Sequence, residues 1–408
     1  MKFIHAADLH LDSPFLGLRH LPASLLAQVR QSTFDAATVI FDRAIDEHVD
    51  FVLLAGDLFD RAEQSVAAQA YLFQQFTRLQ DAQIPVLISF GNHDYLADQH
   101  QTVAYPDNVT VFGAEVSTQT LTLASGETVA VSGFSYPQRW VATDQTPDFP
   151  EHAATDWHIG LLHGAVSTGG AADHYAPFTV AELLAKRYDY WALGHIHQRQ
   201  LLNEQPPILY AGNPQGRAIT EAGDRGAYLV TSEAGQLVPH FFKTAVIGWA
   251  APDLTVTTTP TLTDLGQQVV AWLAANPADL PTLTALTVHL PQPLSGADAA
   301  QLASGDWLVL WQRTQQRAMR AANRYVIAVK VVAAPATVAA PQLDAQYWEA
   351  GAASTFTAAN LQDLFGKLAQ ESALADWFTR PQTASDLETA AQQKLAELMG
   401  EEAHDHEA

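Results

Sequence analysis

The sequence predicts an α/β protein, because short apolar stretches alternate with amphipathic helical patterns over the first half of the chain. The strand-like stretches are residues 3–7, 51–55, 85–90, 158–162 and 190–193. Helical patterns lie between the first three stretches, with apolar side chains on one face at Phe34, Ala37, Phe41, Ala44 and Ile45, and at Leu72, Phe76 and Leu79. This alternation is typical of a largely buried sheet covered by helices. Further strands are expected within residues 109–134, 208–210 and 227–230.

The second half of the chain predicts a smaller α+β unit. The composition changes near residues 245–262, and threonine and proline cluster at residues 255–260, which is typical of a linker. The unit is expected to contain a helix at 265–273, a strand at 283–290, a helix at 311–323 and a strand at 325–332. An Ala/Pro-rich stretch follows, and then a helical C-terminal part. The expected domains are residues 1–245, 260–335 and 340–400, with an acidic tail at 401–408.

Composition excludes several classes of protein. The chain has 408 residues with 21 Lys and Arg against 44 Asp and Glu, a net charge of -23, which excludes coating of nucleic acid by bulk attraction and disfavours binding to anionic membrane surfaces. There is no cysteine, so disulfides and thiolate metal sites are excluded. We do not expect the first residues to act as a signal peptide, because Asp8 comes too early for its apolar region. No apolar run approaches the roughly 20 residues of a membrane span, and we expect a cytoplasmic protein.

Metal-ligating side chains follow the strand-like stretches of the first half. In α/β sheets the carboxyl ends of parallel strands meet at one edge, where ligands bind. The oxygen and imidazole side chains expected at that edge are Asp8, His10, Asp57, Asn92, His163, His195 and His197. The set contains oxygen and imidazole donors but no sulfur, which suits Mn²⁺, Fe²⁺ or Zn²⁺, and Mn²⁺ is the expected ion because oxygen-rich octahedral shells favour it over Zn²⁺.

Seven such ligands are too many for one catalytic ion, and they suit two ions that share a carboxylate. Asp57 is the expected bridge, because a short acidic side chain directly after Gly56 can reach both ions. Glycines at 56, 91, 164 and 194 would let the backbone turn sharply or approach closely beside the metals. An isolated Asp-x-His or Gly-Asp is common in loops, but five such clusters in this order are not explained as solvated loops.

These clusters resemble the signature of the calcineurin-like metallophosphoesterases over about residues 1–240. The matching segments are Asp8-x-His10, Gly56-Asp57, Gly91-Asn92-His93-Asp94, His163-Gly164 and Gly194-His195-x-His197. The resemblance implies a four-layer αββα sandwich with a smaller α+β capping domain and a helical C-terminal segment. It also implies one metal held by Asp8, His10, Asp57 and His197, and a second held by Asp57, Asn92, His163 and His195.

Within the family, the segments at 5–12 and 54–60 resemble the SbcD-type DNA-repair nucleases. Residues 10–15 and 212–217 are most similar to the YhaO-like bacterial exonuclease group. One position departs from the SbcD-type pattern, which usually has a histidine three residues after the bridging aspartate. Here that residue is Asp60, which leaves the contribution of a second catalytic histidine open.

Residues beside the ligands have expected supporting roles. His93 should donate a proton to the leaving group, with Asp94 orienting its imidazole, although a purely structural role for His93 is the alternative. Asp12 and Asp60 either hydrogen-bond ligand histidines or cap local turns.

Arginines are the expected nucleic-acid contacts. Arg217 and Arg225 are candidates for substrate phosphate contacts, or else ordinary ion pairs. Arg313, Arg317, Arg320 and Arg324 would share one face of a helix in the capping domain. This arginine stripe is expected to guide DNA, and a solvated face or an acidic-partner site is the alternative.

The C-terminal helices predict a partner site. Their apolar stripes are Leu361, Leu364, Phe365 and Leu368, followed by Leu387, Ala391, Leu395 and Leu398. In related nucleases such helices grip the coiled coil of an SbcC-like ABC-type ATPase, and packing on their own cap is the alternative. A homodimer is left open. The expected function is hydrolysis of DNA by two metal ions, mainly as an exonuclease. The alternatives are a small-nucleotide phosphodiesterase and a non-catalytic scaffold for the ATPase.

Overall fold

The computed structural model describes residues 1–15, 17–18, 21–61, 64–96, 104–167, 174–258, 260–333, 345–366 and 382–391. The chain forms two compact units. One comprises Met1–Pro252, Val270–Leu286 and Val309–Ala328, and the other comprises Asp253–Val269, Thr287–Leu308 and Val329–Ala408. The domain boundaries expected from the sequence stay a prediction. No helix among the described residues is long and apolar enough to cross a membrane.

The first sheet contains the three strands expected at the N-terminus. Its order is β12 (Gln236–Lys243), β11 (Gly226–Glu233), β1 (Lys2–Ala6), β2 (Phe51–Ala55), β3 (Val86–Ser89) and β4 (Val109–Val111). Strands β1 to β4 run parallel, β11 is antiparallel to β1, and β12 is antiparallel to β11. Successive side chains of a strand point to opposite faces, so Ile4 packs toward the helices and Phe3 packs toward the second sheet.

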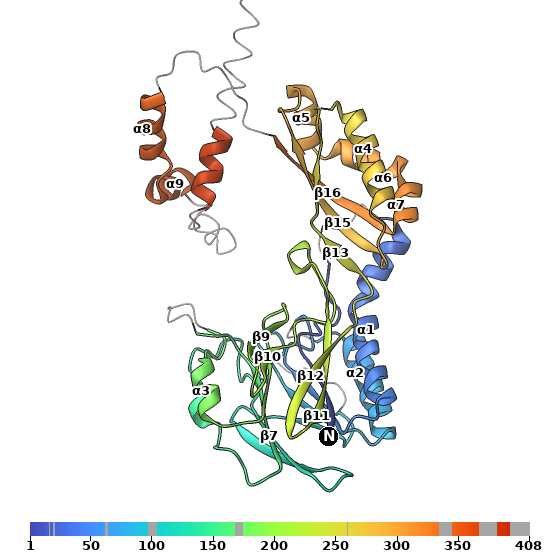
Figure 1. Ribbon diagram of the computed structural model, residues 1–408, viewed down its shortest axis with the longest axis vertical. Coiled ribbons are helices and arrows are strands. Elements are labelled where there is room, and N and C mark those ends of the chain that lie inside the picture. The colour runs from blue at the N-terminus through green and yellow to red at the C-terminus, as the bar shows by residue number, and fades with distance from the viewer. Residues whose placement is uncertain are drawn as a thin grey trace, which may run out of the picture. The chain divides into compact units, whose positions relative to one another are not determined.

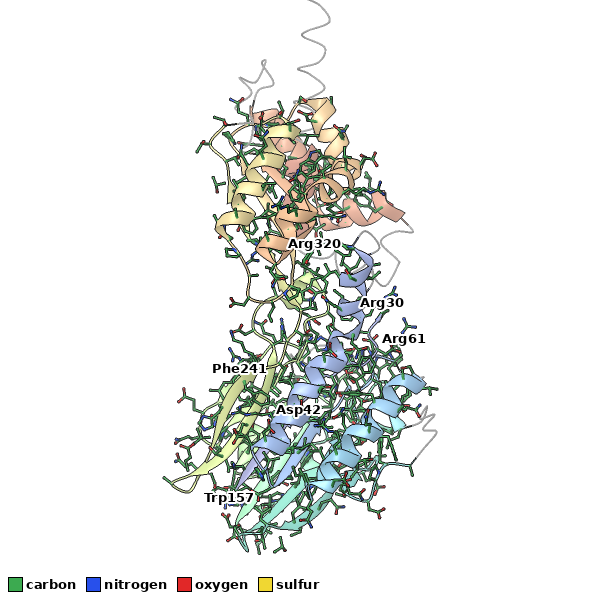
Figure 2. All side chains as sticks on the ribbon, turned by 90° about the vertical axis from the view of Figure 1, so that its right-hand side faces the viewer. Arg30, Asp42, Arg61, Trp157, Phe241 and Arg320 are labelled. Carbon is green, nitrogen blue, oxygen red and sulfur yellow. The ribbon has the colours of Figure 1, made fainter. Side chains whose placement is uncertain are left out.

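Two long helices cover the outer face of this sheet. They are α1 (Ala23–Asp46) and α2 (Val66–Asp81), both expected from their apolar spacing. Ser65 caps α2 by accepting a hydrogen bond from the Ala68 N–H at 3.2 Å. Asp42 of α1, labelled in Figure 2, forms an ion pair with Arg78 of α2 at 2.6 Å.

The second sheet packs on the inner face of the first. Its order is β5 (Ser117–Thr122), β6 (Thr128–Gly133), β7 (Trp157–His163), β8 (Tyr190–Gly194), β10 (Ile208–Tyr210) and β9 (Gln200–Asn203). The short helix α3 (Val180–Ala185) buries Leu183 against the outer face of this sheet. Figure 1 shows α1 and α2 on one side of the two sheets and α3 on the other. The four-layer αββα sandwich is confirmed.

A third sheet carries the smaller α+β elements. It is built from β13 (Gly248–Ala250), β14 (Asp253–Thr255), β15 (Thr282–Leu290) and β16 (Arg324–Ala333). The accompanying helices are α4 (Leu262–Ala275), α5 (Gly296–Ala303), α6 (Asp306–Thr314) and α7 (Gln316–Ala322). The expectation of one helix at 311–323 is wrong, because α6 and α7 are separate helices on either side of Gln315. Helix α5 and the two short strands before residue 256 were not expected.

The break between α6 and α7 separates the arginines that were expected to form one stripe. Arg313 lies in α6, and Arg317 and Arg320 lie in α7. Asn323 adopts a left-handed conformation that ends α7, so Arg324 begins β16 instead of extending the helix. The four arginines therefore do not lie on one helical face.

Helical structure in the C-terminal segment is confirmed for its described parts. These are α8 (Ala345–Thr355), α9 (Ala358–Phe365) and helical residues 382–391. In α9, Leu361 is buried, whereas Leu364 is 75% exposed. Leu368, Leu395, Leu398 and the acidic tail lie outside the described residues.

Candidate metal centre

The candidate ligands converge where five parallel strands end. Asp8, Asp57 and Asn92 follow β1, β2 and β3 of the first sheet, while His163 and His195 end or follow β7 and β8 of the second. Backbone hydrogen bonds tie these loops together. The N–H groups of Asp8 and His10 donate to the carbonyls of Gly56 and Asp57, both at 3.0 Å. The carboxyl ends of both sheets thus meet at one edge, as the sequence predicts.

The first donor group consists of Asp8, His10, Asp57 and His197. One ligand atom from each lies within 4.8 Å of those of the other three, and the first three side chains are buried. The Nε2 atoms of His10 and His197 are 3.1 Å apart. Asp8 also accepts the His195 N–H, at 3.1 Å from Oδ1.

The second donor group shares Asp57 with the first. Oδ1 of Asn92 lies 3.0 Å from His163 Nε2 and 3.2 Å from His195 Nδ1. The same oxygen of Asp57, Oδ2, is 3.7 Å from His10 Nε2 and 3.6 Å from His163 Nε2. One carboxylate oxygen therefore faces both groups, which is the arrangement that a bridging ligand requires.

The chemistry of these atoms fits cations. Nδ1–H of His163 donates to the Ala55 carbonyl at 2.9 Å, so in the neutral ring Nε2 presents a lone pair to the oxygens of Asn92 and Asp57. Burial lowers the pKa of His10 well below its usual value and that of His195 to about 3, so both rings are neutral. Buried lone pairs that face one another without a proton between them are stabilised by a positive ion. The residues present thus fit two divalent ions.

The backbone around the ligands is held in an unusual conformation. Asp8 has φ 53° and Asp57 has φ 52°, both in the left-handed region that residues with a side chain rarely adopt. Gly91 is needed for space, because a Cβ there would overlap Oδ1 of Asp57 and lie 2.6 Å from Nε2 of His163. The close approach that the sequence predicts at Gly91 is present.

His93 projects toward the first donor group, but Asp94 does not orient it. The His93 ring lies 4.9 Å from that of His10, and its Nδ1–H donates to the Asp60 carbonyl at 2.7 Å. The buried Asp94 carboxylate instead accepts the N–H groups of Gly91 at 2.7 Å and Leu58 at 2.6 Å. The role expected for Asp94 is corrected: it joins the loops after β2 and β3, and the backbone of Asp60 orients His93.

Of the two acidic residues considered as support for the candidate ligand histidines, Asp60 lies near one of them and Asp12 does not. Asp60 Oδ1 lies 3.5 Å from His10 Nδ1, an approach too long for a strong hydrogen bond. Asp12 is exposed and makes no hydrogen bond or ion pair with another residue of the described ranges. The expected contact of Asp12 with a ligand is therefore not present.

Arg225 is a structural residue, which corrects its expected contact with phosphate. Only 7% of this residue is exposed. Its guanidinium donates to the carbonyls of Glu221 and Ala222 at 2.9 and 3.0 Å, to the His197 carbonyl, and to Asn213 Oδ1 at 3.0 Å. With four donor contacts inside the protein, Arg225 has almost no capacity left for a substrate.

Arg217 is also turned toward the protein. Its NH1 group forms an ion pair with Asp60 at 2.6 Å, and NH2 lies 3.5 Å from Glu221. Its side chain is 17% exposed, so the arginine lies between two carboxylates instead of facing solvent.

Glu221 is a site residue that the sequence reasoning missed. Its Oε1 lies 2.7 Å from Nδ1 of His197. Against burial, which raises its pKa, the hydrogen bond from His197 and the charge of Arg217 hold that pKa well below its usual value. A signal was available, because Glu221 lies four residues from both Arg217 and Arg225, a spacing that brings opposite charges together on one turn.

The four arginines of the expected stripe differ in their exposure to solvent. Arg313, Arg317 and Arg320 are exposed. Arg324 is half-buried, with its Nε donating to the Asn276 carbonyl at 2.6 Å and its guanidinium over the Trp272 ring.

A buried, oxygen- and imidazole-lined double site at the edge of an αββα sandwich defines a metal-dependent phosphoesterase. Residues 1–199 match the calcineurin-like phosphoesterase family. The chain therefore contains a calcineurin-like metallophosphoesterase domain, as the resemblance of its motifs predicts.

Three individual proteins are similar to this chain over half of its length or more. The chain is 42% identical over 271 residues to the uncharacterized metallophosphoesterase YhaO of Bacillus subtilis, covering 66% of each protein. It is 23% identical to the SbcD component of the nuclease SbcCD of the same organism, over 68% of this chain and 73% of that protein. It is 28% identical to the DNA double-strand break repair protein Mre11 of Sulfolobus acidocaldarius, over 52% of this chain and 54% of that protein. The chain thus spans just under two thirds of YhaO and about half of Mre11.

Proposed function

We propose that this chain is a DNA phosphodiesterase that uses two divalent metal ions, acts mainly as an exonuclease, and serves DNA repair with an ATPase partner. The observation that carries the proposal is the position of Asp57 Oδ2, within 3.7 Å of a histidine from each donor group. A carboxylate shared in this way suits two ions, and phosphodiester hydrolysis is a reaction that such pairs catalyse.

The ligand residues would divide between two ions. Asp8, His10, Asp57 and His197 would hold one, and Asp57, Asn92, His163 and His195 would hold the other. Mn²⁺ is the proposed ion, because a set of carboxylate, amide and imidazole donors without sulfur suits it, with Fe²⁺ and Zn²⁺ as alternatives. When bound, the ions would offset the charge of the phosphate and activate a water for attack.

His93 is the proposed general acid. Its Nδ1–H is fixed on the Asp60 carbonyl at 2.7 Å, which sets the plane of the ring. In the protonated form this hydrogen bond remains, and Nε2 can give its proton to the oxygen that leaves when the phosphodiester bond breaks. The Asp60 carbonyl supplies the orientation that was expected from Asp94.

DNA is the proposed substrate for two reasons. The relatives SbcD and Mre11 are named as part of a nuclease and as a double-strand break repair protein. The exposed Arg313, Arg317 and Arg320 offer phosphate contacts on a chain whose net charge is -23. We therefore expect the isolated protein to bind DNA weakly and in a salt-sensitive way, with a partner supplying much of the affinity.

The proposed partner is an ABC-type ATPase with a coiled coil. Leu364 of α9 is 75% exposed, and this large apolar side chain would anchor a helix of the partner. Arg217 and Arg225 are left out of the proposed DNA surface because their guanidinium groups contact the protein itself.

One assay separates this proposal from its alternatives. The purified protein is incubated with Mn²⁺ and end-labelled duplex DNA, single-stranded DNA or an aryl phosphodiester, with a chelator and Asn92→Ala as negative controls. His240→Ala, a change at a half-exposed histidine of β12 outside both donor groups, is the matched control and should retain activity. DNA shortened from an end supports the proposal. Cleavage of the small diester alone indicates a small-nucleotide enzyme, and no cleavage of any substrate indicates a scaffold.

A further inference from the structure

The connection between β10 and β11 carries a cluster of charged residues that the proposed mechanism leaves unused. It includes Arg217, Glu221 and Arg225, with Glu221 at the end of a 3-10 turn, Ile219–Glu221. Buried groups hold this connection in place. Gln215, 1% exposed, donates to the Ile247 carbonyl at 2.8 Å, and Trp249 Nε1 donates to the Gly216 carbonyl at 2.7 Å. The carboxylate of Glu221 is thus delivered by an anchored segment.

Glu221 fixes the tautomer of His197. A carboxylate can only accept, so at 2.7 Å the Nδ1 atom of His197 carries the proton and donates it to Glu221 Oε1. The 3.2 Å contact of the same Nδ1 with Arg217 NH2 cannot then be a hydrogen bond, because both atoms are donors. The lone pair of the ring is left on Nε2, the atom that faces His10 Nε2 at 3.1 Å.

Both oxygens of Glu221 act as acceptors. Oε1 accepts a hydrogen bond from His197. Oε2 accepts hydrogen bonds from the backbone N–H of Arg217 and from Asn213 Nδ2–H, each at 2.7 Å. A glutamine of the same shape has only one accepting atom. Its NH₂ group would oppose a donor at one end or the other, so the position requires a carboxylate.

Arg217 connects this carboxylate to a second one. Its NH1 lies 2.6 Å from Asp60, and its NH2 lies 3.5 Å from Glu221 Oε1. Asp60 in turn approaches His10 Nδ1 at 3.5 Å. One guanidinium therefore holds an acidic group behind each of the two histidines whose Nε2 atoms face one another.

We propose that Glu221 is a positioning residue for the metal held by Asp8, His10, Asp57 and His197, and that Arg217 stabilises Glu221 and Asp60 in their places behind the two histidines. Glu221 acts through His197, whose proton and ring orientation it sets. The inference rests on the proposed two-metal function, and it places Arg217 in the protein framework instead of on the DNA.

The test measures metal binding, not only activity. Mn²⁺ affinity and stoichiometry are determined by titration of the full chain for the wild type, Glu221→Gln, Glu221→Asp and His197→Ala. Glu233→Gln is the matched control, because Glu233 forms an exposed ion pair with His240, at 2.9 Å, at the opposite end of β11. Thermal unfolding of the metal-free proteins reports whether each variant is folded.

Glu221→Gln should remain folded, lose about 10- to 100-fold in affinity at one of two sites and keep the other site unchanged. Glu221→Asp, which retains two acceptors, should recover part of the loss, and Glu233→Gln should bind as the wild type does. Unchanged affinity at both sites in folded Glu221→Gln, or an equal loss at both sites, overturns the inference. If Glu221→Gln does not fold, Glu221→Asp provides the test. Unaltered metal affinity at both sites in that variant also overturns the inference.

Failure of the proposed nuclease function would give a different combination of metal binding and DNA cleavage. A wild type that binds two ions but cleaves no DNA contradicts the nuclease proposal and leaves the role of Glu221 standing. A wild type that cleaves DNA while Glu221→Gln binds metal normally contradicts only the role of Glu221.

Discussion

His5 is a buried titratable group that links the two sheets, and its replacement tests the packing between them. The residue lies on β1 with no exposed surface. Its Nε2 lies 3.2 Å from the Leu193 carbonyl of β8, and its Nδ1 lies 2.9 Å from the Tyr190 hydroxyl. Because a carbonyl only accepts, Nε2 carries the proton and Nδ1 accepts from the tyrosine. The ring is therefore neutral, with both nitrogens satisfied.

Burial lowers the pKa of His5 from 6.5 to about 3, despite the hydrogen bond to Leu193, which raises it. Between these values the unfolded chain takes up a proton that the folded chain does not, so acid favours unfolding. The contribution of His5 to stability is fully present above about pH 6.5 and is lost progressively as the pH falls toward 3. From pH 7 to pH 5 the loss is about 2 kcal/mol.

The assay is urea unfolding of the metal-free wild type and His5→Gln at both pH values. Glutamine offers one donor and one acceptor but does not titrate, so the other histidines cancel when the two proteins are compared. The free energy of unfolding of the wild type should fall by about 2 kcal/mol more than that of the variant. Equal losses would mean that His5 is accessible to protons, and the account of this contact would be refuted.

The sequence predicted where the candidate ligands lie because each of them ends or closely follows a predicted strand. Asp8, Asp57 and His195 each follow a strand whose direction in the sheet is set by its neighbours, so the edge where they meet follows from topology. The four layers were implied by the resemblance of the motifs to the family, and the structure builds them from strands such as β1 and β2, whose alternate residues face the helices and the second sheet.

Side-chain direction within loops was not predictable. Asp94 follows His93 in sequence, yet its carboxylate turns back to accept backbone N–H groups. The spacing of Arg217, Glu221 and Arg225 indicates contacts among these three residues, but it does not indicate that the segment between β10 and β11 folds onto the histidines. The helix break at Gln315 has no Gly or Pro to mark it, whereas Asn323 is a usual residue for a helix end.

Three further outcomes are expected. Gln215→Ala removes the acceptor of two backbone N–H groups and one buried donor, so urea unfolding should show a loss of about 3 kcal/mol; a loss below about 1 kcal/mol would contradict the anchoring. His93→Ala should keep its metals and lose about 10²–10⁴-fold in turnover, and a change within about tenfold would reject the acid role. Replacement of Arg317 and Arg320 by Glu should weaken DNA binding and flatten its salt dependence. Arg187→Glu, a change just before β8, is the control. Unaltered DNA binding by the double variant would exclude this surface.

Metal content of the Asp57 variant tests the shared carboxylate most directly. Wild type, Asp57→Ala and Asn92→Ala are saturated with Mn²⁺, freed of excess ion, checked for folding and analysed for metal per chain. Two ions sharing Asp57 predict about two per chain in the wild type, about one in Asn92→Ala and close to none in Asp57→Ala. Retention of one tightly bound ion by folded Asp57→Ala would contradict a shared carboxylate and with it the two-metal account.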